Sequence, residues 1–339
     1  MRERFKVFRS ALNHPTMGFS VRFASAAVVL GFSGTCAAYF GRQWNDALPI
    51  AQRYRCFQRW HETKFVHLRR DEKYPNMLIV RFSLPNTFDC LGYDPISSVR
   101  VSIPNPVTGI PSRRWYTPIS HPSERGFVDF AIHDTAGLVA HQMLQMRSGD
   151  RIYLGRWLRQ FKYEPNRHTT VGVVATQGCS SVALQLLECV SRHLTDTTKV
   201  KVLLCVKALP EVAFHRRYLE YKRMMGSRLE VHYNAVSYRK GHDTSSGQLD
   251  LDGIPVTFGL LEAPILERVL PPSSAEGIHV FVCGPPDVVH ILAGRWFSNA
   301  HGFHLSFGAL EYTGFLKDLG YSLSQVTKFG SSSRTSNPR

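Results

Sequence analysis

Acidic side chains are scarce in this 339-residue sequence, which contains 26 Asp and Glu residues against 41 Lys and Arg residues. The formal net charge of +15 favours anionic lipids, acidic proteins or nucleic acids as partners. The sequence also lacks RNP-type, zinc-finger and helix-turn-helix patterns. No nucleic-acid partner is therefore expected, and a basic nucleic-acid-associated protein is the least favoured of three functional hypotheses.

Cysteine pairs with the spacing of a metal or redox site are absent as well. The 7 cysteines are scattered along the chain, are odd in number and include no C-x-x-C pair. The pattern indicates neither a zinc site nor a disulfide framework, and no metal ligands are predicted. This pattern of cysteines is most consistent with reduced thiols in a cytosolic or matrix-like compartment.

Charged residues are missing from residues 23–41, which lie between Arg22 and Arg42. This segment is close in length to the about 20 mostly apolar residues that a membrane-spanning helix needs. Its Ala, Gly, Ser and Thr residues make its hydrophobicity modest, but small residues suit helix packing in a membrane. We expect residues 23–41 to be a single transmembrane anchor, with a buried or interfacial helix as the alternative.

The residues on either side of this segment are basic. Residues 1–22 resemble a mitochondrial targeting leader, so we expect a mitochondrial membrane location, with the endoplasmic reticulum membrane as the alternative. A linker is expected at residues 42–56. Residues 53–70 are dense in Arg, Lys, His and aromatic side chains, which fits a solvated face and contact with anionic headgroups equally well.

The remaining length suggests two domains, at residues 57–165 and 166–329. In the first, short apolar segments joined by Gly- and Pro-containing loops predict a small antiparallel β-barrel. Its strands are expected at residues 77–82, 99–103, 114–119, 126–132 and 151–154, with a short helix at residues 138–146.

The second domain alternates buried apolar strands with amphipathic helices, which predicts a parallel sheet covered by helices on both faces. Ligands of such sheets bind beyond the carboxyl ends of the strands. We expect strands at residues 170–175, 200–206, 229–233 and 278–283, and helices at residues 182–194, 218–225 and 263–270. Residues 330–339 form a polar tail that we expect to be disordered.

The segment Arg114-Trp115-Tyr116-Thr117-Pro118-Ile119-Ser120 carries the most recognisable chemistry. The guanidinium of Arg114 suits a pair of phosphate oxygens, and Tyr116 points the same way if the segment is a strand. The hydroxyl of Thr117 can meet a ring nitrogen or carbonyl of a flat ligand. Pro118 lacks a backbone donor and marks the edge or end of the strand. The alternative is an ordinary edge strand with an exposed Arg and a half-buried Tyr.

This segment resembles the flavin signature R-x-Y-T/S of the NADH–cytochrome b5 reductase family, within the ferredoxin–NADP reductase superfamily. The resemblance runs from about Pro75 to Phe329 and follows the family's order of motifs. These motifs include Phe82-Ser83-Leu84-Pro85, Gly126 to Phe130, Ser148-Gly149-Asp150 and Cys283-Gly284-Pro285-Pro286. The resemblance implies an α+β fold with an N-terminal transmembrane helix. This helix would be followed by a flavin-binding antiparallel β-barrel domain and then by an α/β parallel-sheet domain that binds NAD(P).

The resemblance also implies a set of site residues. Arg114 would bind the FAD diphosphate, Tyr116 would pack on the flavin ring, and Cys283 would place the nicotinamide of NADH or NADPH. Cys283 and Thr117 are the predicted catalytic residues. The predicted cofactor-binding residues are Arg114, Tyr116, Thr117, Pro118, Ser120, His133, Gly137, Leu138, Val139, Gly178, Ser181, Gly284 and Pro285.

Several contact positions depart from the family pattern. His133 begins a stretch that replaces the usual Lys-x-Tyr, and Ala140 lacks the hydroxyl expected at the diphosphate. The glycine-rich nucleotide loop is replaced by Thr176-Gln177-Gly178-Cys179, and Ser237 stands where an acidic residue favours NADH. The loss of the acid at Ser237, with Arg239 and Lys240 nearby, fits acceptance of a 2′-phosphate and loss of nucleotide binding equally well.

Two functional hypotheses remain. The first is a membrane-anchored FAD-dependent reductase that passes electrons from NADH or NADPH to a small acidic haem protein such as cytochrome b5. The second is a reductase-like accessory subunit of a mitochondrial membrane complex that has lost its activity.

Overall fold

The computed structural model describes residues 36–44, 47–53, 60–105, 108–134, 137–209, 212–238, 249–294 and 312–330. The chain divides into two compact units, residues 1–58 and 59–339. In the first unit, residues 36–44 are helical and η1 (Ile50–Gln52) is a 3-10 turn. No helix in the described ranges combines the length and the apolar character that crossing a bilayer requires. The predicted leader, residues 23–35 of the predicted anchor and residues 331–339 of the predicted tail lie outside the described residues.

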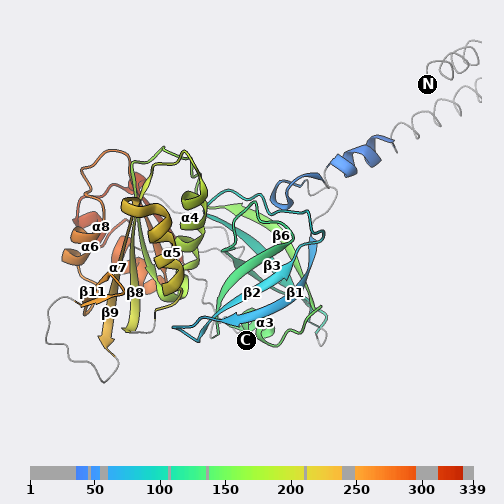
Figure 1. Cartoon of the computed structure of the whole chain (residues 1–339), viewed down its shortest axis with the longest axis horizontal. Helices are drawn as coiled ribbons and strands as arrows, with labels where there is room; N and C mark the ends of the chain where they lie inside the picture. The colour runs from blue at the N-terminus through green and yellow to red at the C-terminus, as the bar shows by residue number, and fades with distance from the viewer. Residues whose placement is uncertain are drawn as a thin grey trace, which may run out of the picture. The chain divides into compact units, whose positions relative to one another are not determined.

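The second unit begins with an antiparallel barrel (Figure 1). Its strands follow the order β4-β3-β6-β1-β2-β5. A bridge between Pro118 and Phe130, and a 2.9 Å hydrogen bond from the Ile119 amide to the Asp129 carbonyl, join the ends of this order. The strands are β1 (His61–Arg70), β2 (Met77–Ser83), β3 (Ser97–Ile103), β4 (Ser112–Tyr116), β5 (Phe127–His133) and β6 (Arg151–Arg159).

Apolar side chains of alternate residues fill the barrel. Phe82 packs edge-on against Phe65 and Phe130, with ring centroids 5.9 and 6.2 Å apart, as aromatic pairs prefer. The strand predicted to run to Ile119 ends at Tyr116, because Pro118 cannot donate to a ladder. The short helix α3 (Leu138–Leu144) follows β5.

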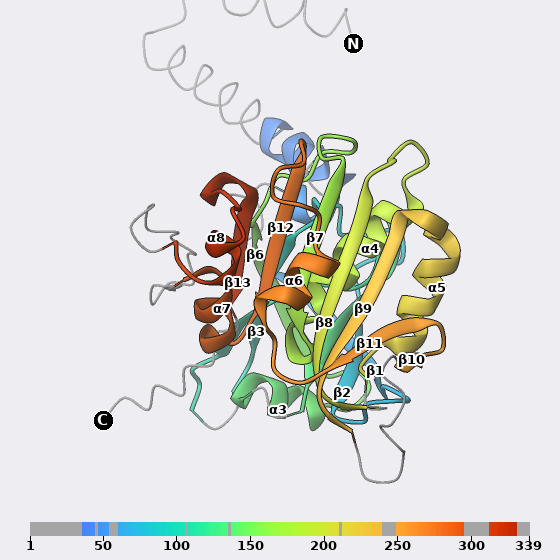
Figure 2. The ribbon, with the colours of Figure 1, turned by 90° about the vertical axis from the view of Figure 1, so that its left-hand side faces the viewer.

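The rest of the unit is a seven-stranded sheet (Figure 2). Its order is β10-β11-β9-β8-β7-β12-β13, and all neighbours are parallel except the β10–β11 hairpin. The chain order reverses between β7 and β12, which makes their carboxyl ends the expected place for a ligand. The strands are β7 (Thr170–Thr176), β8 (Lys199–Leu209), β9 (Leu229–Tyr238), β10 (Leu249–Leu251), β11 (Ile254–Phe258), β12 (Ile278–Gly284) and β13 (Val326–Gly330).

Helices cover both faces of this sheet. On one face, α4 and α5 share a hydrophobic core with the barrel residues Met77, Ile79, Ile96 and Ile119. On the other, α6, α7 and α8 pack with the alternate residues of the strands. The helices are α4 (Ser181–Arg192), α5 (His215–Met225), α6 (Ala263–Val269), α7 (Pro286–Ala293) and α8 (Phe315–Asp318), and the 3-10 turns are η2 (Gln177–Cys179), η3 (Gly226–Arg228) and η5 (Leu323–Gln325).

Candidate functional site

Arg114 of β4 meets the start of α3. Its Nη1 lies 3.2 Å from the position that a Cβ atom on Gly137 would occupy. Gly137 has a φ of +94° and precedes the first residue of the helix, so glycine is favoured both by its backbone and by the guanidinium beside it. The structure thus places Arg114, which was predicted to bind the diphosphate, next to Gly137 at the predicted start of the helix.

Tyr116 lies next to this guanidinium, whose carbon is 6.0 Å from the centroid of the phenol ring. The side chain is buried, packs against Phe130, and leaves its hydroxyl without a hydrogen-bond partner among the described residues. Burial raises the pKa of Tyr116 to about 12, so the hydroxyl remains protonated at neutral pH. An unpartnered buried hydroxyl beside an arginine is a group that a bound ligand could satisfy.

The residues that follow Tyr116 bind other parts of the protein. The Thr117 hydroxyl lies 3.1 Å from that of Ser98, and the Ser120 hydroxyl accepts a 3.2 Å hydrogen bond from the Asp129 amide. Pro118 makes the bridge that closes the barrel. Thr117 remains half-buried, whereas Pro118 and Ser120 are buried.

His133, at the end of β5, contacts two neighbouring polar side chains. Its Nε2 is 3.0 Å from the Tyr74 hydroxyl, and its Nδ1 is 3.3 Å from Asp134. Burial lowers the pKa of His133 although Asp134 opposes this, so the ring is neutral at pH 7. In α3, Val139 is buried and Leu138 is exposed.

At the carboxyl ends of β7 and β12, Ala175 pairs with Cys283. The Cys283 side chain is 1% exposed and belongs to the core shared with α4 and α5. Burial raises the pKa of this thiol well above its ordinary value, so the thiol is neutral. A Cβ atom on Gly284 would lie 3.3 Å from the Thr176 methyl group, which shows how closely the two strand ends approach. Pro285 precedes α7 as its N-cap.

The loop after β7 forms the 3-10 turn η2 rather than an open glycine loop. Gln177 is buried, and its Oε1 has no hydrogen-bond partner among the described residues. Gly178 is exposed, with nothing within 4 Å of a Cβ built on it. Ser181 begins α4 directly afterwards and is half-buried.

Comparisons with known proteins point to one family. An oxidoreductase FAD-binding domain matches residues 69–163, which include the barrel strands β2 to β6, Arg114, Tyr116 and Gly137. NADH-cytochrome b5 reductase 2-B of Vanderwaltozyma polyspora is 27% identical over 248 residues, 73% of this chain and 76% of the relative. NADH-cytochrome b5 reductase 2 of Botryotinia fuckeliana is 26% identical over 250 residues, 74% of this chain and 67% of the relative. The chain is thus similar in sequence to the NADH–cytochrome b5 reductases, although it diverges from them.

Solved structures show the same fold. The cytochrome b5 reductase domain of Ulva prolifera nitrate reductase superposes with a TM-score of 0.63 at 14% identity, over 83% of this chain and 100% of that domain. The residues present at the barrel site of this reductase relative fit FAD, because Arg114 can bind phosphate oxygens and Tyr116 offers an unpartnered hydroxyl.

Sequence reasoning missed Gln185, which lies one turn after Ser181 in α4. The side chain is fully buried and binds the main chain of the barrel at Ser97 and at Pro118. A polar residue in an amphipathic helix is typical of a solvent-facing position, so the pattern of α4 alone could not reveal this contact.

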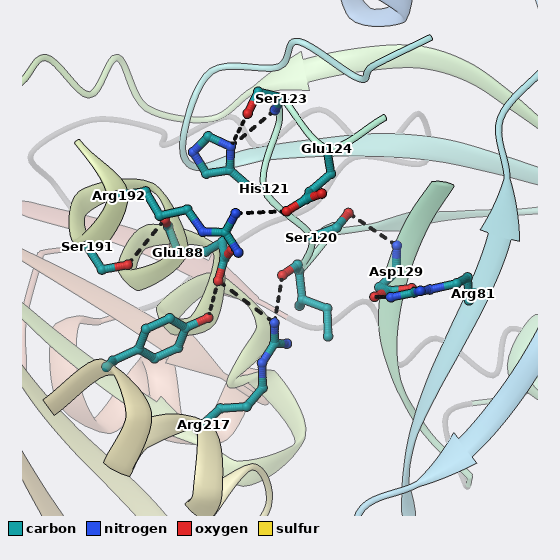
Figure 3. Close-up of polar contacts among 12 residues, drawn as sticks. Arg81, Ser120, His121, Ser123, Glu124, Asp129, Glu188, Ser191, Arg192 and Arg217 are labelled. Carbon is teal, nitrogen blue, oxygen red and sulfur yellow. Dashed lines mark hydrogen bonds and ion pairs between the residues drawn. The ribbon is translucent and has the colours of Figure 1, made fainter. Parts of the chain in front are cut away.

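A second set of polar contacts joins the same surfaces (Figure 3). Arg192 of α4 binds Glu124 of the barrel at 2.8 Å and Glu188 of its own helix at 2.7 Å. Arg217 of α5 donates to the Ile119 carbonyl at 3.4 Å and lies 3.9 Å from Glu188. Helices α4 and α5 therefore contact the segment from Ile119 to Glu124, which directly follows the flavin motif.

Proposed function

We propose that this chain is an FAD-dependent NAD(P)H reductase that passes electrons from the nucleotide to a small haem protein such as cytochrome b5. The observation that carries the proposal is the Arg114 guanidinium at the start of α3 beside the unpartnered hydroxyl of Tyr116. Both residues lie within the segment that matches an oxidoreductase FAD-binding domain.

The residues at the site have separate tasks in this proposal. Arg114 would neutralise phosphate charge through paired hydrogen bonds. Tyr116 would donate a hydrogen bond from a fixed, buried position. FAD, when bound, supplies hydride acceptance and single-electron transfer.

Cys283 and Gly284 would help to place the nicotinamide. The raised pKa of Cys283 keeps the thiol neutral, which fits a packing and positioning role and not a nucleophilic one. The close approach of Gly284 to Thr176 fixes the two strand ends that would face the nucleotide.

The proposed partner rests on the basic charge of the chain, and the proposed location rests on the uncharged segment 23–41 behind a basic leader. Exposed cations on β1, namely Lys64, Arg69 and Arg70, belong to a strongly basic chain that would attract an acidic electron acceptor. We propose that residues 23–41 anchor the reductase in a mitochondrial membrane, or alternatively in the endoplasmic reticulum membrane.

A second candidate is an accessory subunit of a mitochondrial membrane complex that does not use the nucleotide. Gln177 favours it, because a buried side chain stands in the loop where relatives of this type need glycine for close backbone approach. The intact Arg114 and Tyr116 arrangement favours the first candidate.

The two candidates differ in one spectroscopic experiment. The full chain is purified in detergent, its visible spectrum is recorded, and NADH or NADPH is added without oxygen. Yellow protein that bleaches with either nucleotide supports the reductase. Yellow protein that stays oxidised, or colourless protein that takes up no added FAD, contradicts it and supports the accessory subunit.

A further inference from the structure

We infer that Gln185 is a positioning residue that holds the flavin-binding strand in register with the nucleotide loop during hydride transfer. The inference rests on the proposed reductase function and deepens it. Gln185 would touch neither FAD nor nucleotide; it acts through the main chain at Ser97 and Pro118, next to residues that would.

The amide of Gln185 is used as both acceptor and donor. Its Oε1 accepts a 2.8 Å hydrogen bond from the Ser97 amide, and its Nε2 donates to the Ser97 carbonyl at 3.0 Å. The same Nε2 donates to the Pro118 carbonyl at 3.1 Å. Because Gln185 is fully buried and Ser97 is 2% exposed, water cannot replace these bonds without opening the interface.

On the barrel side, these bonds reach the flavin motif directly. Pro118 follows Thr117 and lies two residues after Tyr116. Ser97 precedes Ser98, whose hydroxyl lies 3.1 Å from that of Thr117. Gln185 therefore fixes the start of β3 and the segment after β4, the two segments whose Ser98 and Thr117 hydroxyls lie together, and the Thr117 hydroxyl is the one expected near the reactive edge of the flavin.

On the sheet side, Gln185 lies one turn after Ser181, the first residue of α4. The η2 turn, Gln177–Cys179, ends two residues before this helix and follows β7 directly. A helix is rigid over one turn, so a displacement of Gln185 is passed on to Ser181 and the end of the loop. One side chain thus sets the separation between the two halves of the site.

Small errors in such a separation are costly. A misplacement of about 1 Å between reacting groups can slow a reaction by about a hundredfold. The contact between Arg192 and Glu124 also joins α4 to the barrel, but it lies two turns further along the helix and is partly exposed. Replacing Glu124 with Gln weakens this contact and leaves the Arg192–Glu188 pair in place, so it provides a matched control for an interface contact outside the motif.

The test compares the full-chain holoprotein with Gln185→Met, Gln185→Glu and Glu124→Gln. Methionine keeps the length of the side chain but removes every hydrogen bond. Glu, which burial keeps protonated, retains the acceptor for the Ser97 amide and a single hydroxyl donor for the two carbonyls. Bound FAD, thermal melting, the rate of anaerobic flavin reduction at saturating NADH or NADPH, and the rate of reduction by dithionite are measured for each. Dithionite needs no alignment of the two halves of the site.

We expect Gln185→Met to slow reduction by the nucleotide about tenfold to a hundredfold per bound flavin, with dithionite reduction unchanged. Gln185→Glu should lie between Gln185→Met and wild type, and Glu124→Gln should match wild type. If the Met variant does not fold, the Glu variant carries the comparison. Equal rates per bound flavin in all folded variants, or equal slowing by nucleotide and by dithionite, would overturn the inference. If neither nucleotide reduces the wild-type flavoprotein, the proposed function is wrong. The inference then fails with it before any variant is compared.

Discussion

The hydroxyl of Tyr221 on α5 donates a 2.6 Å hydrogen bond to Glu188 on α4, a carboxylate that is only 4% exposed. Arg192 binds the other oxygen of Glu188 at 2.7 Å. A buried carboxylate is tolerated only when its lone pairs are satisfied. The contacts of Glu188, seen in Figure 3, therefore satisfy the carboxylate, and its hydrogen bond with Tyr221 fixes α4 to α5.

Replacing Glu188 with Ala should lower the free energy of unfolding by about 2–3 kcal/mol, because Tyr221 and Arg217 would lose a charged partner in a buried setting. Urea denaturation measures the change. Glu220→Ala is the control, since its contact with Arg216 at 3.5 Å is exposed and should contribute less than about 0.5 kcal/mol. Equal effects of the two substitutions would show that the Glu188 contacts do not stabilise the interface.

Arg114→Ala should weaken FAD binding by about tenfold to a hundredfold, the loss expected for a charge-assisted hydrogen bond. Isothermal titration of the apoprotein with FAD gives the affinity. Arg113→Ala is the matched control, because Arg113 precedes it in β4, is exposed and lies 5.5 Å from the Trp60 ring. If the Arg113 variant lost as much affinity as the Arg114 variant, a general charge effect would explain both.

The Tyr116→Phe variant tests whether the Tyr116 hydroxyl binds a ligand or stabilises the fold. Because the hydroxyl has no partner among the described residues, its removal should leave the stability of the apoprotein unchanged or slightly higher. The affinity for FAD should fall about threefold to tenfold, since a single neutral hydrogen bond is lost. A clear drop in apoprotein melting temperature with unchanged FAD affinity would contradict the assigned role.

Asp196 should stabilise the fold in a pH-dependent way. Burial raises the pKa of Asp196, but hydrogen bonds from Tyr163 at 2.6 Å and from the Thr198 amide at 3.0 Å outweigh it and leave the pKa below its ordinary value. The carboxylate therefore contributes stability above the unfolded-state pKa of about 3.9, and this contribution is lost as the pH falls through the lower folded-state pKa.

Asp196→Asn should cost about 1.5–3 kcal/mol at pH 7, and the difference from wild type should shrink below about pH 4. Urea denaturation over this pH range provides the measurement. Glu164→Gln, which removes exposed ion pairs with Lys162 and Arg167, is the control and should change little. A difference that persists unchanged at low pH would mean that the charge of Asp196 is not involved.

The long, strongly patterned elements of this fold could be read from the sequence. The apolar run of β7, the alternation in β5 and the amphipathic pattern of α4 each follow from local residue choice. The β10–β11 hairpin was missed, although its turn at Asp252-Gly253 carries a strong hairpin signal. Its strands are only 3 and 5 residues long, too short to show a period.

The site residues could be predicted only where the family motif that contains them is a short continuous segment of the sequence. Arg114 and Tyr116 stand in one strand, so their proximity follows from the alternation of side chains. The approach of Gly137 to Arg114 was expected only through the resemblance, because it depends on how α3 returns to β4. The role of Gln185 could not be predicted, since its partners lie 88 and 67 residues away and are main-chain atoms without a sequence signature.

This choice of partners has an evolutionary consequence. The hydrogen bonds of Gln185 end on the amide and carbonyl groups of Ser97 and on the carbonyl of Pro118. Side chains at positions 97 and 118 can therefore change without removing the groups that Gln185 binds. Drift at those two positions imposes no compensating change at position 185. The contact that ties the two halves of the molecule together should consequently leave little trace as correlated substitutions among homologues.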